Sequence, residues 1–412
     1  MNRIAGYRCT LCRKEYPFGP ERMTCPSCGE KGILDIVYDY QSVRRIFSRE
    51  TLQKDHDNSM WRYRALMPIQ GEGLADFLRI GWTPLYRSRK LGGQIGLNTL
   101  YIKDDGLNPT GSLKDRASGV AVAKAIELGY DTICCSSTGN AASSCAGNAA
   151  RMGLKTVIFV PERAPIGKVA QLLIFGANVV SVKGDYRQTF ELSKAAIEKW
   201  GFYNRNAGIN PVMTEGKKTV AIEIAEQLNW NPTDWVAISV GDGCTIGGVY
   251  NGFYDLLQLG MIERIPKILG VQSTGCCPFV NADAAGGALV PTPENTLADS
   301  ISVGVPRNPV KAQRAVKASG GAWIAVSDDE ILEAMRMLGR AEGVFGEPAG
   351  VTATAGVKAA VERGMIKSSE SVTVVSTGSG LKDVKNAMLA AGEPFACEPD
   401  IRVLEASGRI KQ

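Results

Sequence analysis

The sequence of 412 residues contains a single histidine, His56, and no hydrophobic run long enough to span a membrane. One histidine cannot build a histidine metal cluster, and it allows a Ser-His-Asp triad only if His56 itself takes part. The charged residues around His56 predict a solvated loop position. Acid–base chemistry in this protein must therefore rest on lysine, carboxylate, tyrosine or hydroxyl groups, or on a cofactor.

The sequence also lacks runs of lysine or arginine, although its formal net charge is +5. A charge spread in this way gives no reason to expect nucleic acid or an acidic membrane as a partner. The first residues, Met1-Asn-Arg-Ile, lack the apolar core of a signal peptide, so we expect a cytoplasmic protein. With 44% apolar residues, the chain can bury one large core and has the length for two.

Cysteines are plentiful, and four of them follow a pattern. Cys9, Cys12, Cys25 and Cys28 form two C-x2-C pairs separated by twelve residues, which is the spacing of a four-thiolate zinc ribbon. A degenerate ribbon held by other contacts, or a pair of disulfides, would give the same pattern. We expect zinc, because the chain lacks a secretion signal. The other cysteines are expected to be reduced core residues: Cys134, Cys135, Cys145, Cys244, Cys276, Cys277 and Cys397.

From Trp82 onward, short β-rich runs alternate with alanine-rich helical segments. Such alternation predicts an α/β protein with parallel sheets covered on both faces. We expect a zinc-ribbon-like segment at 1–35, a small α/β domain at 116–204, and a large α/β domain formed by 36–115 and 205–412. The expected strands are Thr132–Ser136, Thr156–Val160, Asn178–Val182, Trp235–Val240, Lys267–Gln272, Ala322–Val326 and Val372–Ser376. The expected helices include Asn140–Met152, Tyr186–Trp200, Lys218–Leu228 and Asp328–Gly343.

Lys114 is the first candidate for chemistry. It follows the turn residues Asn108, Pro109 and Gly111 and precedes a helical apolar spacing, so it is predicted to lie just inside a helix N-terminus. The partial positive charge of a helix start lowers the pKa of a lysine. Such an amine suits imine formation with an aldehyde cofactor. A solvated lysine beside Asp115 is the alternative.

Three loops after predicted strands are small, polar and rich in glycine: 137–143, 241–248 and 377–383. In parallel α/β folds, ligands bind beyond the carboxyl ends of the strands, where these loops lie. The first loop could hold a carboxylate at a helix start, and the second resembles a phosphate cradle leading into a helix that begins near Val249. A simple N-cap and a tight turn would explain the two loops almost as well.

The order of these motifs resembles that of the threonine synthases, within the tryptophan synthase β-like group of pyridoxal phosphate enzymes (fold type II). The resemblance covers nearly the whole chain and implies two parallel-sheet α/β domains with a short N-terminal zinc ribbon. The motifs that carry it are the four cysteines, Trp61–Arg64, Trp82–Leu85, Lys103–Arg116, Ser136–Asn140, Gly241–Thr245, Glu347–Ala349 and Thr377–Asp383.

The resemblance implies roles for individual residues. Lys114 matches the lysine that forms an aldimine with pyridoxal phosphate and moves protons on the substrate. Asn140 matches the asparagine bonded to the phenolic oxygen of the cofactor, and Thr377 matches a hydroxyl that faces the pyridine nitrogen. The implied cofactor phosphate loop consists of Gly241, Asp242, Gly243, Cys244 and Thr245. The implied substrate contacts are Ser137, Thr138, Gly139, Ala141 and Lys168.

Threonine synthases convert O-phosphohomoserine and water to threonine and phosphate, which requires a cationic pocket for the leaving phosphate. They usually carry a serine and an arginine in an Asn-Ser-x-Asn-Pro-x-Arg stretch, where this chain has Gly208 and Met213. Lys168 remains available as a phosphate partner, and Lys217 or Lys218 is a candidate replacement.

This departure leaves alternatives open. One is a lyase or β-replacement enzyme that acts on diaminopropionate, serine, threonine or an O-activated serine. Another is a non-catalytic relative in which the ribbon and the fold serve as an interaction module. The family habit implies a homodimer.

Overall fold

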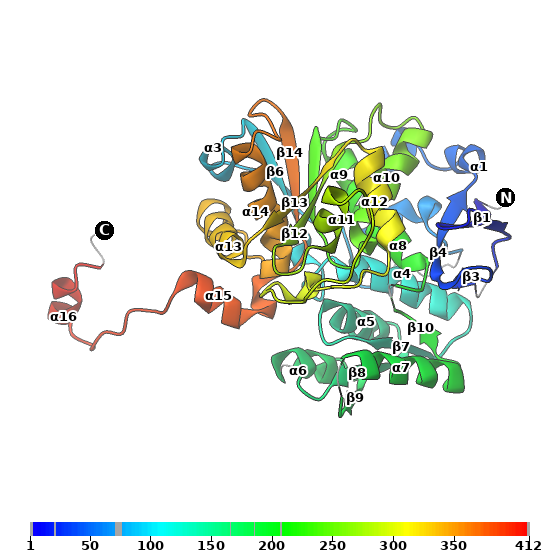
Figure 1. Cartoon of the computed structure of the whole chain (residues 1–412), viewed down its shortest axis with the longest axis horizontal. Helices are drawn as coiled ribbons and strands as arrows, with labels where there is room; N and C mark the ends of the chain where they lie inside the picture. Colours follow the sequence, from blue (N-terminus) through cyan, green and yellow to red (C-terminus); the bar gives the residue numbers. More distant parts are fainter. Residues whose placement is uncertain are drawn as a thin grey trace.

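The computed structural model describes residues 3–19, 22–70, 76–164, 166–184, 186–206 and 208–409. Its strands form three sheets, two of them mainly parallel and surrounded by helices (Figure 1). Figure 1 also shows the N-terminal sheet at one edge of the body and the C-terminal helix α16 (Ile401–Ala406) projecting from the opposite edge. No helix in the described ranges combines the length and the apolar character needed to cross a membrane.

The largest sheet has six strands in the order β13-β12-β11-β14-β6-β5, and only β5 is antiparallel to its neighbour. The central strands β11 and β14 are buried along almost their whole length, because helices cover both faces. The strands are β5 (Leu85–Arg87), β6 (Thr99–Asp104), β11 (Trp235–Ser239), β12 (Lys267–Ser273), β13 (Ala322–Val326) and β14 (Ser371–Ser376).

The second sheet is fully parallel, with the order β10-β7-β8-β9. It lies within the region for which the sequence predicts a small domain. One hydrophobic core cluster runs through both sheets and the N-terminal segment, so the division into domains stays a prediction. The strands are β7 (Thr132–Ser136), β8 (Lys155–Pro161), β9 (Asn178–Val182) and β10 (Tyr203–Asn204).

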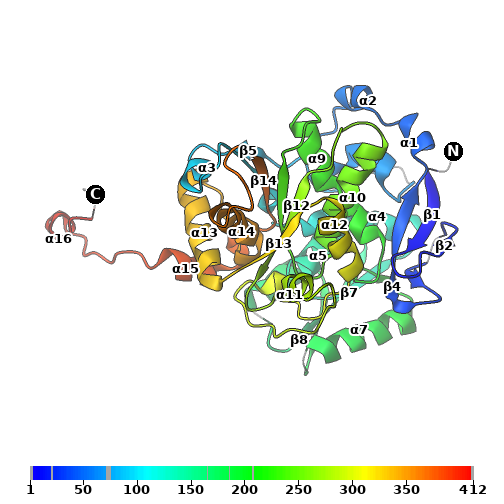
Figure 2. The same ribbon diagram turned by 45° about the horizontal axis from the view of Figure 1, so that its top comes forward.

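The N-terminal segment forms an antiparallel sheet in the order β2-β1-β4-β3, with β1 (Ile4–Cys9), β2 (Glu15–Tyr16), β3 (Thr24–Cys25) and β4 (Gly29–Tyr38). Figures 1 and 2 place this sheet beside α7 (Tyr186–Trp200), and a Lys194–Glu30 ion pair joins the two. Apolar side chains of β1 and β4 belong to the main core, and these contacts hold the segment in place.

The α-helices of the described residues mostly surround the two mainly parallel sheets. Beside α7 and α16 they are α1 (Tyr40–Arg44), α2 (Arg49–Gln53), α3 (Leu91–Gln94), α4 (Lys114–Glu127), α5 (Asn140–Arg151), α6 (Ile166–Ile174), α8 (Val212–Lys217), α9 (Thr219–Gln227), α10 (Cys244–Gln258), α11 (Pro278–Ala284), α12 (Pro309–Ala318), α13 (Asp328–Glu342), α14 (Pro348–Glu362) and α15 (Val384–Ala391). The strands and helices that were predicted with both bounds are confirmed to within one residue at each end. His56 is confirmed as an exposed loop residue.

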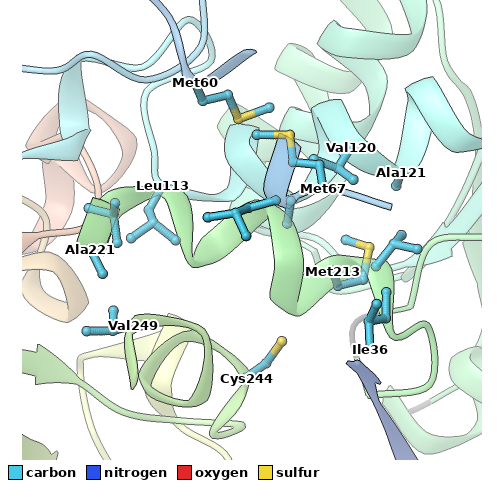
Figure 3. Close-up of a cluster of buried hydrophobic side chains, with 14 of the residues drawn as sticks. Ile36, Met60, Met67, Leu113, Val120, Ala121, Met213, Ala221, Cys244 and Val249 are labelled. Atoms are coloured by element: carbon cyan, nitrogen blue, oxygen red, sulfur yellow. The ribbon is translucent and has the colours of Figure 1, made fainter. Parts of the chain in front are cut away.

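The fully buried helix α8 packs against α4 and α10 at the centre of the molecule. Figure 3 shows this cluster, in which the side chain of Met213 lies among Met67, Val120 and other apolar side chains. Because Met213 is fully buried in this core, it fills space in the hydrophobic interior.

Candidate active site

A cavity of about 1190 Å³ opens between the two parallel sheets, lined by loops at the carboxyl ends of β7, β11 and β14. It brings together residues that are far apart in the sequence. The predicted site residues that line it are Lys114, Ser137, Thr138, Gly139, Asn140, Ala141, Gly241, Asp242, Gly243, Cys244, Thr245 and Thr377. Lys168 is the exception: its ammonium group pairs with the carboxylate of Asp299, which does line the cavity. The role of Lys168 stays a prediction.

Lys114 is the first residue of α4, as the sequence predicts. The two residues that follow it fix this position. The Asp115 carboxylate accepts hydrogen bonds from the Thr110 backbone N–H and hydroxyl and from the Asn148 amide, at 2.8–2.9 Å. Arg116 is fully buried and forms ion pairs with Asp105 and Glu223 at 2.6–2.7 Å. The alternative of a solvated lysine paired with Asp115 is therefore wrong, because other groups occupy that carboxylate.

The pKa of Lys114 is lowered to about 8. Burial is the largest cause, and the positive charge of Lys217 adds to it, while Glu347 acts in the opposite direction. The direction agrees with the sequence-based expectation, but burial rather than the helix start is the main reason. An amine with this pKa has a substantial uncharged fraction near neutral pH and can both attack a carbonyl and carry protons.

The glycine loop after β11 leads directly into α10, which begins at Cys244. The prediction of a helix start near Val249 is wrong by more than one turn. Gly247 and Gly248 lie inside the helix, and glycine is needed there because α12 and α8 pack closely: a Cβ at Gly247 would lie 2.8 Å from Lys311 Cβ, and one at Gly248 3.0 Å from the Thr214 carbonyl oxygen. The first backbone N–H groups of α10 therefore come from the loop residues that line the cavity.

Three loops are joined around Lys114 by backbone hydrogen bonds. Leu113 N–H donates to the Thr377 carbonyl, and Ser379 N–H donates to the Gly111 carbonyl, both at 2.9 Å. Glu347 N–H donates to the Gly378 carbonyl at 2.9 Å. These bonds hold Thr377 beside the start of α4.

Glu347 is a buried cavity residue to which the sequence analysis assigned no role. Its carboxylate accepts a hydrogen bond from the side-chain amide of Asn140 at 2.6 Å. Burial, reinforced by the charge of Asp299, raises the pKa of Glu347 to about 7. The Gly346-Glu-Pro-Ala motif at the start of α14 was the only signal for it in the sequence.

The loop after β7 starts α5 at Asn140, and Ser137 accepts a hydrogen bond from Gly139 N–H at 3.2 Å. The space in front of Gly139 is open, since a Cβ there would meet only Ser300 Oγ, at 3.9 Å. A small anion such as a carboxylate fits this helix start.

Of the two lysines proposed to replace the missing arginine, Lys217 lines the cavity and Lys218 does not. Lys218 is buried and pairs with Glu215 and Asp255. Arg205, Arg307 and Asn206 also line the cavity, and the sequence analysis named none of them.

The residues present fit pyridoxal phosphate. Its aldehyde requires an uncharged amine, which Lys114 supplies. Its phosphate requires N–H donors, and the first N–H groups of α10 have no acceptor within the helix. The loop approaches its neighbours too closely for side chains: a Cβ at Gly241 would lie 2.8 Å from Ile301 Cα, and one at Gly243, where φ is +85°, 2.7 Å from the Asn308 carbonyl oxygen.

The four patterned cysteines lie together in the N-terminal segment. Their sulfur atoms are all within 4.8 Å of one another, and none forms a disulfide. The disulfide alternative for this segment is therefore wrong. Of the other seven cysteines, five are buried as expected, whereas Cys277 is partly exposed and Cys397 is exposed.

Comparison with known proteins also indicates a pyridoxal phosphate enzyme. Residues 77–378 match the family described as pyridoxal-phosphate dependent enzyme. The chain is 40% identical to the threonine synthase of Methanocaldococcus jannaschii, over 97% of this chain and 98% of that protein. It is 37% identical to the threonine synthase of Methanosarcina acetivorans, over 96% of each.

Solved structures share the fold. The processed form of threonine deaminase isoform 2 from Solanum lycopersicum aligns with a TM-score of 0.66 and 22% identity, covering 82% of this chain and 95% of that one. Diaminopropionate ammonia lyase from Escherichia coli aligns with a TM-score of 0.66 and 19% identity, covering 79% and 95%. The chain belongs to the pyridoxal-phosphate dependent enzymes of this fold. Within that class it belongs to the threonine synthase family.

Proposed function

We propose that this enzyme converts O-phosphohomoserine and water to threonine and phosphate. The identity to threonine synthases over nearly the full chain supports this reaction. The observation that carries it is Lys114, a partly buried amine with a pKa of about 8, in one cavity with a helix-start phosphate cradle.

We assign the cofactor contacts to this chain's own groups. The Lys114 amine would hold the aldehyde carbon of pyridoxal phosphate, and the N–H groups of 241–245 would hold its phosphate. The Asn140 amide would bind its phenolic oxygen, and the Thr377 hydroxyl would face its ring nitrogen. When bound, pyridoxal phosphate withdraws electrons from the carbon that bears the substrate amino group, so that this carbon can lose a proton.

Lys114 takes one proton from the substrate Cα and one from Cβ, so that phosphate leaves from Cγ with the bonding electrons. Protons then return to Cγ and Cα, and water adds to Cβ to give the hydroxyl of threonine. One group can serve repeatedly because a pKa of about 8 allows it both to accept and to return a proton near neutral pH. The loop from Ser137 to Ala141, which leads into the start of α5, holds the substrate carboxylate and so fixes the orientation of Cα.

The test is release of phosphate from O-phosphohomoserine by the purified protein, with threonine detected as the product and Lys114→Ala as the control. Threonine from the wild type and none from the variant is the expected result. A protein that makes no threonine, but whose cofactor spectrum shifts on addition of diaminopropionate or serine, would contradict the proposal and favour a lyase or β-replacement reaction.

We also propose that Cys9, Cys12, Cys25 and Cys28 bind one structural zinc ion as a ribbon. Tetrahedral zinc with Zn–S bonds of about 2.3 Å requires sulfur–sulfur distances of about 3.8 Å. The Cys12–Cys25 sulfur distance of 3.7 Å supports this geometry. Replacing Cys9 and Cys12 by serine should abolish zinc in metal analysis and increase proteolysis of the N-terminal segment, with cofactor content unchanged. A wild-type protein without zinc would rule out the ribbon.

We propose, finally, that the enzyme is a cytoplasmic homodimer. Support comes from the exposed apolar side chains of α15 and of the segment after it, which projects from the body: Leu389, Phe395, Ile401 and Val403. Light scattering should give twice the chain mass for the wild type and a lower mass when Phe395 and Ile401 are replaced by serine. A monomeric wild type would contradict the dimer.

A further inference from the structure

Arg307 lies in the loop before α12 and lines the same cavity as Lys114. Its side chain passes over Gly208, which stands where the family pattern has a serine. A Cβ at Gly208 would lie 2.5 Å from Arg307 Cδ and 2.7 Å from Arg307 Cβ. A serine at 208 and Arg307 in its present position therefore exclude each other, and the glycine is what admits the arginine.

The guanidinium group is held in place without being neutralised. It stacks on the ring of Phe190, with 3.8 Å between Cζ and the ring centroid. The backbone N–H of Arg307 donates to the Asp242 carboxylate at 2.7 Å, which ties this loop to the loop after β11. None of the ion pairs within the described residues uses Arg307. Its charge acts on the nearby Asp242 carboxylate, but without a direct ion pair to it, so the guanidinium can still bind a ligand.

The other cations around the cavity are placed differently. Lys168 and Lys311 are paired with Asp299 and Asp35, and Arg205 donates twice to Ser118. Lys217 acts on the pKa of Lys114, so it lies at the cofactor end. Arg187 and Lys31 are exposed. Arg307 is partly buried, supported by an aromatic ring and directed to the cavity.

We propose that Arg307, admitted by Gly208, binds the terminal phosphate of the substrate and so takes over the role of the arginine replaced by Met213. This inference rests on the proposed function and specifies how the substrate is recognised. A guanidinium stacked on a ring keeps its edge N–H groups free, and two of them match two phosphate oxygens. Its positive charge also stabilises the phosphate as it leaves.

The main test compares Arg307→Met and Arg307→Lys with a control at an exposed arginine away from the cavity, Arg363→Met. Loss of a charge-assisted pair should raise the KM for O-phosphohomoserine about 10- to 100-fold, and kcat should fall less. Inhibition by inorganic phosphate should weaken by a similar factor. Cofactor content and the spectral response to threonine, which has no phosphate, should stay as in the wild type. Lysine should restore part of the affinity, and the control should match the wild type.

An unchanged KM and unchanged phosphate inhibition in Arg307→Met would overturn the proposal, and so would loss of the cofactor, since Arg307 would then serve the cofactor phosphate. Binding of inorganic phosphate, followed by calorimetry on the holoenzyme, separates this inference from the reaction. If the wild type makes no threonine but binds phosphate in an Arg307-dependent way, the anion site stands and the proposed reaction fails.

A second measurement tests the steric pairing. Gly208→Ser should displace Arg307 and raise KM by itself, whereas in an Arg307→Ala background the same serine should have little further effect. Such non-additivity is the signature of two residues that share one space. Additive effects of the two substitutions would overturn the claim that Gly208 acts through Arg307.

Discussion

Lys114 begins α4, and Lys218 directly follows α8, which packs against α4, yet the surroundings of the two lysines shift their pKa values in opposite directions. Burial lowers the pKa of both. Lys218, however, has Glu215 at 2.5 Å and Asp255 at 2.7 Å, and these carboxylates outweigh burial and raise its pKa. No ion pair among the described residues involves Lys114, and its pKa falls to about 8. Missing partners, rather than burial alone, make a lysine chemically active.

The largest expected effect concerns turnover. Lys114→Ala should reduce threonine formation below detection and remove the visible absorbance of the lysine-bound cofactor, because both depend on the amine. Far-ultraviolet circular dichroism should be unchanged. Retained turnover would show that the reaction does not need the Lys114 amine, and that Lys114, like Lys218, has only a structural role.

Lys218→Met should instead act on stability. It leaves Glu215 and Asp255 buried without their counter-charge, which typically costs about 3–5 kcal/mol. Urea unfolding measures this loss. Adding Glu215→Gln to the same chain should recover part of it. A variant as stable as the wild type would mean that the buried network contributes nothing.

The smallest effect is a pH dependence of the apo-enzyme. The pKa of Lys114 is about 8 when folded and about 10.5 when unfolded, so between these values the unfolded chain binds more protons. Stability should therefore rise with pH across this window, by at most about 3 kcal/mol, relative to Lys114→Met. Urea titrations of both proteins at pH 7 and pH 10 measure the difference. Equal pH slopes would show that the Lys114 amine is not perturbed.

Much of this arrangement could be predicted from local sequence. Strands such as β7 and β11 are largely apolar runs, and the turn residues Asn108, Pro109 and Gly111 indicate the start of α4. The helix start at Cys244 was missed because Gly247 and Gly248 suggested a loop, whereas they allow close packing against α12 and α8.

Contacts between distant segments could not be predicted in this way. Asn140 and Glu347 are 207 positions apart, and no local pattern links them. The same holds for Gly208 and Arg307: the sequence showed that an arginine was missing, and only the fold shows which other arginine lies over that glycine.

The position of β14 has a consequence for synthesis of the chain. This strand is the last to be made, yet it lies between β6 and β11 in the middle of the large sheet. Until Ser371–Ser376 has left the ribosome, β6 lacks its parallel neighbour, and Leu113 lacks the Thr377 carbonyl that holds it. The contact between Leu113 and Thr377 can therefore form only after β14 has been synthesised, so a chain that stops before β14 should be inactive.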